Sequence, residues 1–238
     1  MNAVRELQFS VLDKDEVSAL LLLPSKVSCL LVMAHGAGAG MNHPFMSAMA
    51  NELAGVGIGT LRYQFPYMEQ HRHVPDPQPV LLATVAAAVK LGAKLVPKLP
   101  LFASGKSMGG RMTSLAAAEQ ILEGVRGLVF FGFPLHPPKR PGIKRAEHLK
   151  KVKQPMLFLQ GTRDELADLA LLRPICDGLG SQATLYIVEG ADHSFHVLKR
   201  SGKTDAEVLG ELARTVEAWT ADHSGTETAK KSAPPAKP

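Results

Sequence analysis

The stretch Leu99-Pro-Leu-Phe-Ala-Ser-Gly-Lys-Ser-Met-Gly-Gly-Arg111 decides the fold that this sequence predicts. Its apolar start, 101–103, suits a buried strand, and the residues from 111 onward favour a helix. A serine on a sharp turn between strand and helix needs neighbours without Cβ atoms, which Gly105 and Gly109 provide. Such a turn raises the Ser107 hydroxyl above the sheet and places the Met108 amide at the start of the helix. The pattern indicates a nucleophile elbow.

A phosphate-binding P-loop is the competing interpretation, because Gly105-Lys-Ser107 also follows a strand and opens a helix. That motif needs a glycine five residues before its second glycine, where the phosphate-binding loop begins. Pro100 stands at that position, and residues 101–104 continue the strand instead. The sequence therefore excludes a P-loop.

Length and composition predict one α/β domain over residues 1–222, followed by a disordered basic tail rich in Ala, Lys and Pro at 223–238. The two cysteines form no disulfide framework, and neither a signal-peptide pattern nor an apolar run of membrane-spanning length is present. We therefore expect a cytoplasmic protein with no membrane partner. The formal net charge of +5 comes without a basic segment interleaved with aromatic residues, so no nucleic acid is expected either.

Short apolar runs alternate with helix-forming segments along the chain. A hairpin is predicted over 4–23, and further strands over 27–34, 56–62, 127–133, 155–160 and 183–188. Helices are predicted over 43–54, 80–96, 108–122, 145–152, 166–179 and 204–222. Residues 63–79 are expected to form a long loop, whose His71 and His73 lack further ligands at a spacing that would bind a metal. The alternation predicts a mostly parallel central sheet with helices on both faces.

Three more segments place polar groups just after strands. The glycine-rich loop 35–40 offers the Ala37 amide as a second donor to an oxyanion, with a plain flexible turn as the alternative. Asp164 follows the strand at 155–160, where a helix N-cap is the alternative role. His193 follows the last strand, and His196 competes with it for the role of base.

The chain order Ser107, Asp164, His193 is the order found in α/β-hydrolases. The sequence resembles that superfamily, and within it the dienelactone-hydrolase-like family of small bacterial hydrolases. It is also similar to the hydrolase-like domain of a eukaryotic histone-acetyltransferase complex subunit. The segments that carry the resemblance are His35–Gly38, His43–Met46, Leu61–Tyr67, Gly105–Arg111, Phe133–Pro138, Gly161–Asp164 and Ala191–Phe195.

The resemblance implies an α/β-hydrolase fold with a Ser107–His193–Asp164 triad. His193 would take the proton of Ser107, Asp164 would orient the imidazole, and the Ala37 and Met108 amides would form the oxyanion hole. Dienelactone hydrolases proper use cysteine as the nucleophile, and this chain has serine. We therefore expect hydrolysis of a small ester or thioester through an acyl-enzyme, without cofactor or metal. The alternative is a non-catalytic protein-interaction module on the same scaffold.

The segment 135–154 offers only a proline-rich turn and a short helix as a lid, so the site is expected to be open. Arg62, Lys106 and Arg111 are predicted to bind substrate, with Lys139 and Arg140 near the entrance. Together these charges favour small anionic acyl substrates.

Overall fold

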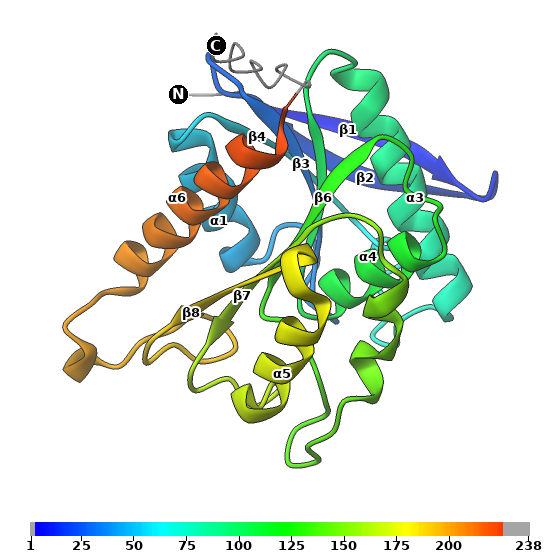
Figure 1. The fold of residues 1–238 in the computed structure, drawn as a ribbon. Coiled ribbons are helices and arrows are strands. Elements are labelled where there is room, and N and C mark those ends of the chain that lie inside the picture. Colours follow the sequence, from blue (N-terminus) through cyan, green and yellow to red (C-terminus); the bar gives the residue numbers. More distant parts are fainter. Residues whose placement is uncertain (1–2, 226–238) are drawn as a thin grey trace, which may run out of the picture.

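An eight-stranded sheet forms the centre of the computed structural model, which describes residues 3–225 (Figure 1). The strands are β1 (Val4–Val11), β2 (Asp15–Leu22), β3 (Cys29–Ala34), β4 (Ile58–Tyr63), β5 (Leu101–Lys106), β6 (Val125–Phe131), β7 (Met156–Gly161) and β8 (Ala183–Val188). Their order in space is β1-β2-β4-β3-β5-β6-β7-β8. The β1–β2 hairpin pairs antiparallel and joins β4 antiparallel, whereas β3 to β8 pair in parallel. The predicted mostly parallel sheet is confirmed.

The strand order reverses at β3, because the chain moves from β3 to β4 on one side and then to β5 on the other. Ligands of open α/β sheets bind beside the carboxyl ends of the strands at such a switch point. Here Ala34, the last residue of β3, pairs with Gly105 near the end of β5. The loop after β3 and the turn after β5 therefore start side by side.

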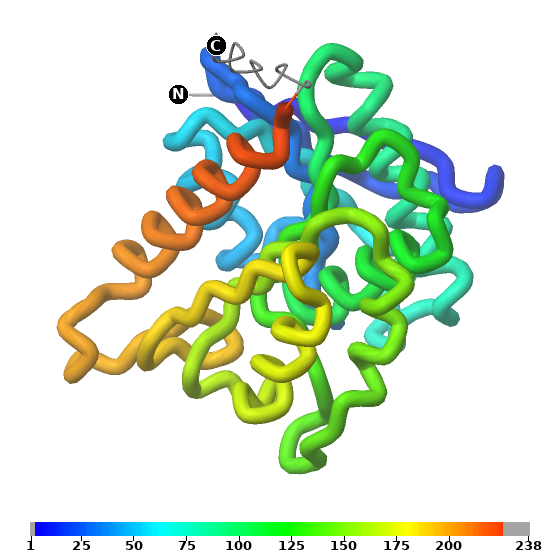
Figure 2. Tube along the Cα trace, viewed as in Figure 1, coloured from blue at the N-terminus to red at the C-terminus, as the bar shows by residue number. Residues whose placement is uncertain are grey.

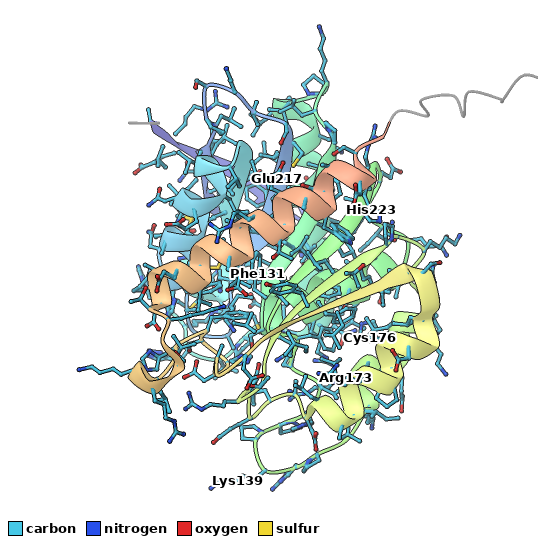
Figure 3. The ribbon with its side chains drawn as sticks, turned by 60° about the vertical axis from the view of Figure 1, so that its left-hand side comes forward. Phe131, Lys139, Arg173, Cys176, Glu217 and His223 are labelled. Atoms are coloured by element: carbon cyan, nitrogen blue, oxygen red, sulfur yellow. The ribbon has the colours of Figure 1, made fainter. Side chains whose placement is uncertain are left out.

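Helices cover both faces of the sheet (Figure 1). One face packs against α1 (Pro44–Gly55) and α6 (Asp205–His223), and its core includes Phe131, labelled in Figure 3. The other face packs against α3 (Gln78–Leu95), α4 (Met108–Ala118) and α5 (Leu169–Leu179). Three shorter helical elements are the 3-10 helices η1 (Lys144–Lys151), η2 (Gly180–Gln182) and η3 (Lys199–Ser201).

The segment between β6 and β7 contains η1 as its only helical element among the described residues. Figure 2 shows its green loop extending beyond the body of the molecule. No separate domain covers the carboxyl edge of the sheet in the part of the chain that the structure describes. The segment between β6 and β7 therefore forms the minimal lid that the sequence predicts, a loop followed by η1.

Several predicted boundaries differ from the observed ones. Residues 63–79 are not all loop, since α2 (Pro66–Glu69) starts at a proline, which suits the first turn of a helix. Strand β6 ends at Phe131 because Gly132 turns out of the sheet with a φ of 68°. Helix α5 starts at Leu169, where the Asp168 carboxylate caps the Ala170 amide.

Helix α3 is the one described helix whose length and composition would allow it to cross a membrane. Its apolar side chains Leu81, Leu82, Val85 and Val89 are buried in the core beside the sheet. This burial explains its composition as that of a core helix. At the other end of the chain, α6 extends to His223, and residues 226–238 of the predicted tail lie outside the described residues.

Candidate active site

Ser107 stands on the turn between β5 and α4, with φ 52° and ψ −117°. A positive φ is strained for a residue with a side chain, and such strain persists only where the surroundings enforce it. The Ser107 amide donates to the Phe131 carbonyl at 3.2 Å, and its carbonyl accepts from the Arg111 amide at 3.1 Å. Both sides of the turn are thus fixed.

The glycines around Ser107 allow α4 to pack directly on the sheet. A Cβ added to Gly105 would lie 2.3 Å from the Gly109 carbonyl carbon, and one added to Gly109 would lie 2.4 Å from the Ala34 oxygen. Real Cβ atoms do not approach other atoms so closely. The structure therefore gives the steric reason for both glycines of the elbow.

The three residues predicted as a triad lie within hydrogen-bond distance of one another. His193 Nε2 lies 2.8 Å from Ser107 Oγ, and His193 Nδ1 lies 2.7 Å from Asp164 Oδ2. The Asp164 side chain is 0% exposed and the His193 side chain is 25% exposed. A buried carboxylate thus orients an imidazole whose far side meets the serine hydroxyl, as nucleophile activation requires.

Asp164 is held by more than His193. Its Oδ2 accepts a hydrogen bond from Gln160 Nε2, and its Oδ1 accepts from the Leu166 amide at 2.8 Å. Gln160 is itself oriented by the Phe133 amide, which donates to Gln160 Oε1 at 3.0 Å. These contacts fix the carboxylate relative to the loop that follows β6.

His196 lies in another environment. Its Nδ1 is 2.8 Å from Asp205 Oδ2 at the start of α6. The hydrogen bond to Asp205 and then the Asp205 charge raise the pKa of His196. The structure therefore brings His193, and not His196, into contact with Ser107 and Asp164.

The glycine-rich loop after β3 passes close to Ser107. A Cβ on Gly36 would lie 3.7 Å from Ser107 Cβ. The Ala37 amide makes no backbone hydrogen bond among the described residues, and Met108 is the first residue of α4, where an amide has no partner within the helix. Both amides predicted for the oxyanion hole thus have N–H groups that the backbone does not use, and Gly36, next to Ala37, lies beside the serine.

The residues around α2 hold this loop in place. His35 Nε2 accepts from the Phe65 amide at 3.2 Å, so Nδ1 carries the proton donated to the Gly36 carbonyl at 2.7 Å. The Gly38 amide donates to Tyr67 Oη at 3.0 Å, and the Met41 amide donates to Gln64 Oε1 at 2.8 Å. Burial lowers the pKa of His35 to about 4, which keeps the ring neutral for these contacts.

The cations predicted to bind substrate are directed into the protein. Arg62 is 5% exposed, and its Nη1 donates to the Met41 carbonyl at 3.0 Å and to Ser47 Oγ at 2.8 Å. Lys106 is 9% exposed, and its amine donates to the His193 carbonyl at 2.6 Å. Both side chains leave the sheet on the α1 side because strand alternation sends them there. These contacts correct the expectation that Arg62 and Lys106 face a substrate.

Arg111 is half-buried on α4 beside η1. Burial and then the charge of Arg145 lower its pKa. Next to it, Ser114 Oγ lies 2.7 Å from His148 Nε2, which connects α4 with η1. Lys139 and Arg140 are exposed in the loop after β6, and Figure 3 shows Lys139 pointing away from the body of the molecule.

Sequence reasoning missed two residues beside the triad: Gln160, which donates to Asp164, and Gly132, whose Cβ would stand 3.3 Å from His193 Nδ1. Gln160 is an uncharged polar residue in an otherwise apolar strand, which is a signal visible in the sequence. Gly132 gave no signal, because its role depends on the register between β6 and β7. Among residues 3–225, no group of three or more His, Cys, Asp or Glu side chains could hold a metal ion.

The sequence matches a protein family described as "Alpha/beta hydrolase domain" over residues 27–221. The structure is similar to dienelactone hydrolase from Anabaena variabilis ATCC 29413, at 22% identity and a TM-score of 0.75, over 94% of this chain and 99% of that one. It is also similar to XC6422 from Xanthomonas campestris, described as a serine hydrolase without lid, at 21% identity and a TM-score of 0.71, over 91% of this chain and 94% of that one. Est1E from Butyrivibrio proteoclasticus is similar at 16% identity and a TM-score of 0.69, over 92% of this chain and 98% of that one. At these identities the likeness is one of fold.

Proposed function

The chain belongs to the α/β-hydrolase family, and from this premise we propose that it is a serine hydrolase that cleaves a small ester or thioester. One observation carries the proposal: His193 lies within hydrogen-bond distance of both Ser107 Oγ and Asp164 Oδ2. The elbow strain at Ser107 supports it, because a non-glycine residue with positive φ at a strand–helix turn is a mark of functional sites. The names of the similar structures, a dienelactone hydrolase and an esterase domain among them, agree with this chemistry.

In the proposed reaction, Ser107 Oγ attacks the substrate carbonyl carbon while its proton passes to His193 Nε2. The negative charge on the carbonyl oxygen is stabilised by the Ala37 and Met108 amides, each contributing about 3 kcal/mol. Asp164 stabilises the imidazolium, which then protonates the leaving alcohol or thiol as its bond to carbon breaks. His193 next takes a proton from water as the water oxygen bonds to the acyl carbon. The bond between that carbon and Ser107 Oγ then breaks, the imidazolium returns its proton to Oγ, and the acid is released.

The surroundings of the triad suit a small substrate. The segment between β6 and β7 contains only a loop and η1, with no lid domain. The exposed edge of His193 is therefore accessible to solvent. Lys139 and Arg140 in that loop are exposed. We propose that they, rather than Arg62 or Lys106, favour substrates with a carboxylate or phosphate on the acyl group.

A fluorophosphonate probe tests the proposed function without knowledge of the natural substrate. We expect it to label Ser107 in the folded protein, and Ser107→Ala and His193→Ala each to abolish labelling. His196→Ala is the matched control. We expect it to leave labelling unchanged, because the His196 imidazole contacts Asp205 and not Ser107. A folded, unlabelled wild-type protein would contradict hydrolase activity and favour the protein-interaction module.

A further inference from the structure

Lys106 is the residue before the nucleophile, and its side chain is buried on the opposite face of the sheet from α4. Its Nζ lies 2.6 Å from the carbonyl oxygen of His193 and 5.7 Å from the ring centres of both Phe45 and Phe195. Those two rings stack on each other, with centroids 5.8 Å apart. Lys106 therefore connects the end of β5, one residue before the serine, with the loop that carries the base.

The amine lies beside the triad itself. A Cβ added to Gly132 would stand 3.1 Å from Lys106 Nζ, 3.3 Å from His193 Nδ1 and 3.4 Å from Asp164 Oδ2. All three polar atoms thus surround one point that only a glycine leaves empty. No carboxylate among residues 3–225 forms a direct ion pair with the amine.

We propose that Lys106 is a positioning residue of the triad: its hydrogen bond holds the His193 backbone to the nucleophile elbow. The proposal rests on the proposed function. It assigns Lys106 a role that acts through His193 and not through contact with the substrate.

The positioning role follows from the 2.6 Å distance between Lys106 Nζ and the His193 carbonyl oxygen, and from the charge of the amine. A bond from an ammonium group to a carbonyl is about twice as strong as one between neutral groups. The loop that carries His193 is also held to the residues that follow β7. The Arg163 amide, for example, donates a hydrogen bond to the Ala191 carbonyl at 2.9 Å. A shift of about 1 Å in the imidazole would lower the rate strongly, since nucleophile activation depends on distance.

The groups that face the amine are Asp164 after β7, and Asp192 and His193 in the loop after β8. Burial lowers the pKa of Lys106 to about 8, while both carboxylates act in the opposite direction, so the amine is a cation at neutral and acid pH. The hydrogen bond to the His193 carbonyl is therefore charge-assisted.

Three substitutions test the hydrogen bond. Lys106→Met removes the donor and the charge, Lys106→Gln keeps an N–H donor without charge, and Lys106→Arg keeps both. The measurements are kcat and KM for a p-nitrophenyl ester, and the rate of fluorophosphonate labelling, at neutral pH. Lys94→Met, which removes an exposed lysine of α3, is the matched control.

We expect Lys106→Met to lower kcat about tenfold or more with little change in KM, because the substrate does not contact the amine. Lys106→Gln and Lys106→Arg keep an N–H donor and should show a smaller loss of kcat. Lys94→Met should match wild type throughout.

A folded Met variant with wild-type kcat and KM would overturn the proposal while leaving the hydrolase function intact. Should Lys106→Met fail to fold, the same result in Lys106→Gln would overturn it. Should wild type fail to react with the probe, the proposed function fails instead. The NMR chemical shifts of the His193 backbone in wild type and Lys106→Met or Lys106→Gln then test the positioning alone, with equal shifts as the contradicting result.

Discussion

At the scale of the residue, His35 links the acid sensitivity of the fold to the loop beside Ser107. Its folded-state pKa of about 4 lies below the usual value of 6.5, so the neutral ring contributes stability that is fully present above about pH 6.5 and is lost as the pH falls toward 4. At about pH 5 the loss amounts to roughly 2 kcal/mol of unfolding free energy. Urea unfolding at pH 7.5 and 5 measures it, and His35→Gln should reduce this pH dependence. An unchanged dependence in that variant would assign the effect elsewhere, for example to His148.

At the scale of the element, the crossing of α4 over the ends of β3 and β5 depends on the absence of side-chain atoms. Gly109→Ala places a Cβ 2.4 Å from the Ala34 oxygen and 2.6 Å from the His35 oxygen, both backbone atoms that cannot rotate away. We expect about 2 kcal/mol or more of destabilisation and a loss of Ser107 labelling, since the elbow must shift. Gly55→Ala at the end of α1 is the control, because nothing lies within 4 Å of its Cβ position. Equal stability of both variants would contradict this steric account.

The elbow beneath α4 is the part of the site that the sequence predicts best. Local patterns decide the elbow, so the strand, the glycines and the helix around Ser107 are visible in the sequence, and so is the order of the strand ends carrying Asp164 and His193. Strand alternation sends Lys106 and Arg62 to the α1 side, but their burial there depends on tertiary packing. A lysine buried without an ion pair runs against the usual distribution of charged residues. Helix α2 was missed because four residues are too few for periodicity.

At the scale of the whole molecule, the positive charge is concentrated. Residues 139–153 contain seven lysines and arginines and one glutamate, whereas the whole chain has a formal net charge of +5. The chain leaves the carboxyl edge of the sheet after β6, where the triad stands, and returns to the amino edge at the start of β7. The charge proposed to attract an anionic substrate therefore lies on the first part of this segment, with Lys139 and Arg140.

This distribution predicts a salt-dependent preference. We expect kcat/KM for p-nitrophenyl hemisuccinate to exceed that for p-nitrophenyl butyrate at low ionic strength, and the ratio to fall about threefold or more as the screening length drops from about 30 to about 8 Å. Charge reversal at Lys139 and Arg140 should reduce the ratio, while reversal of the exposed Lys94 should not. A butyrate preference that is indifferent to salt would contradict the proposed substrate class.

The loop between His35 and Met41 is tied at its start, middle and end to residues 64–67 by hydrogen bonds that exist before any substrate arrives. The conformational entropy of this loop is therefore lost once, when the chain folds, and not again in each catalytic cycle. A boronic acid that adds to Ser107 should accordingly bind in a single kinetic step, without the slow isomerisation that a loop closing over its ligand would produce.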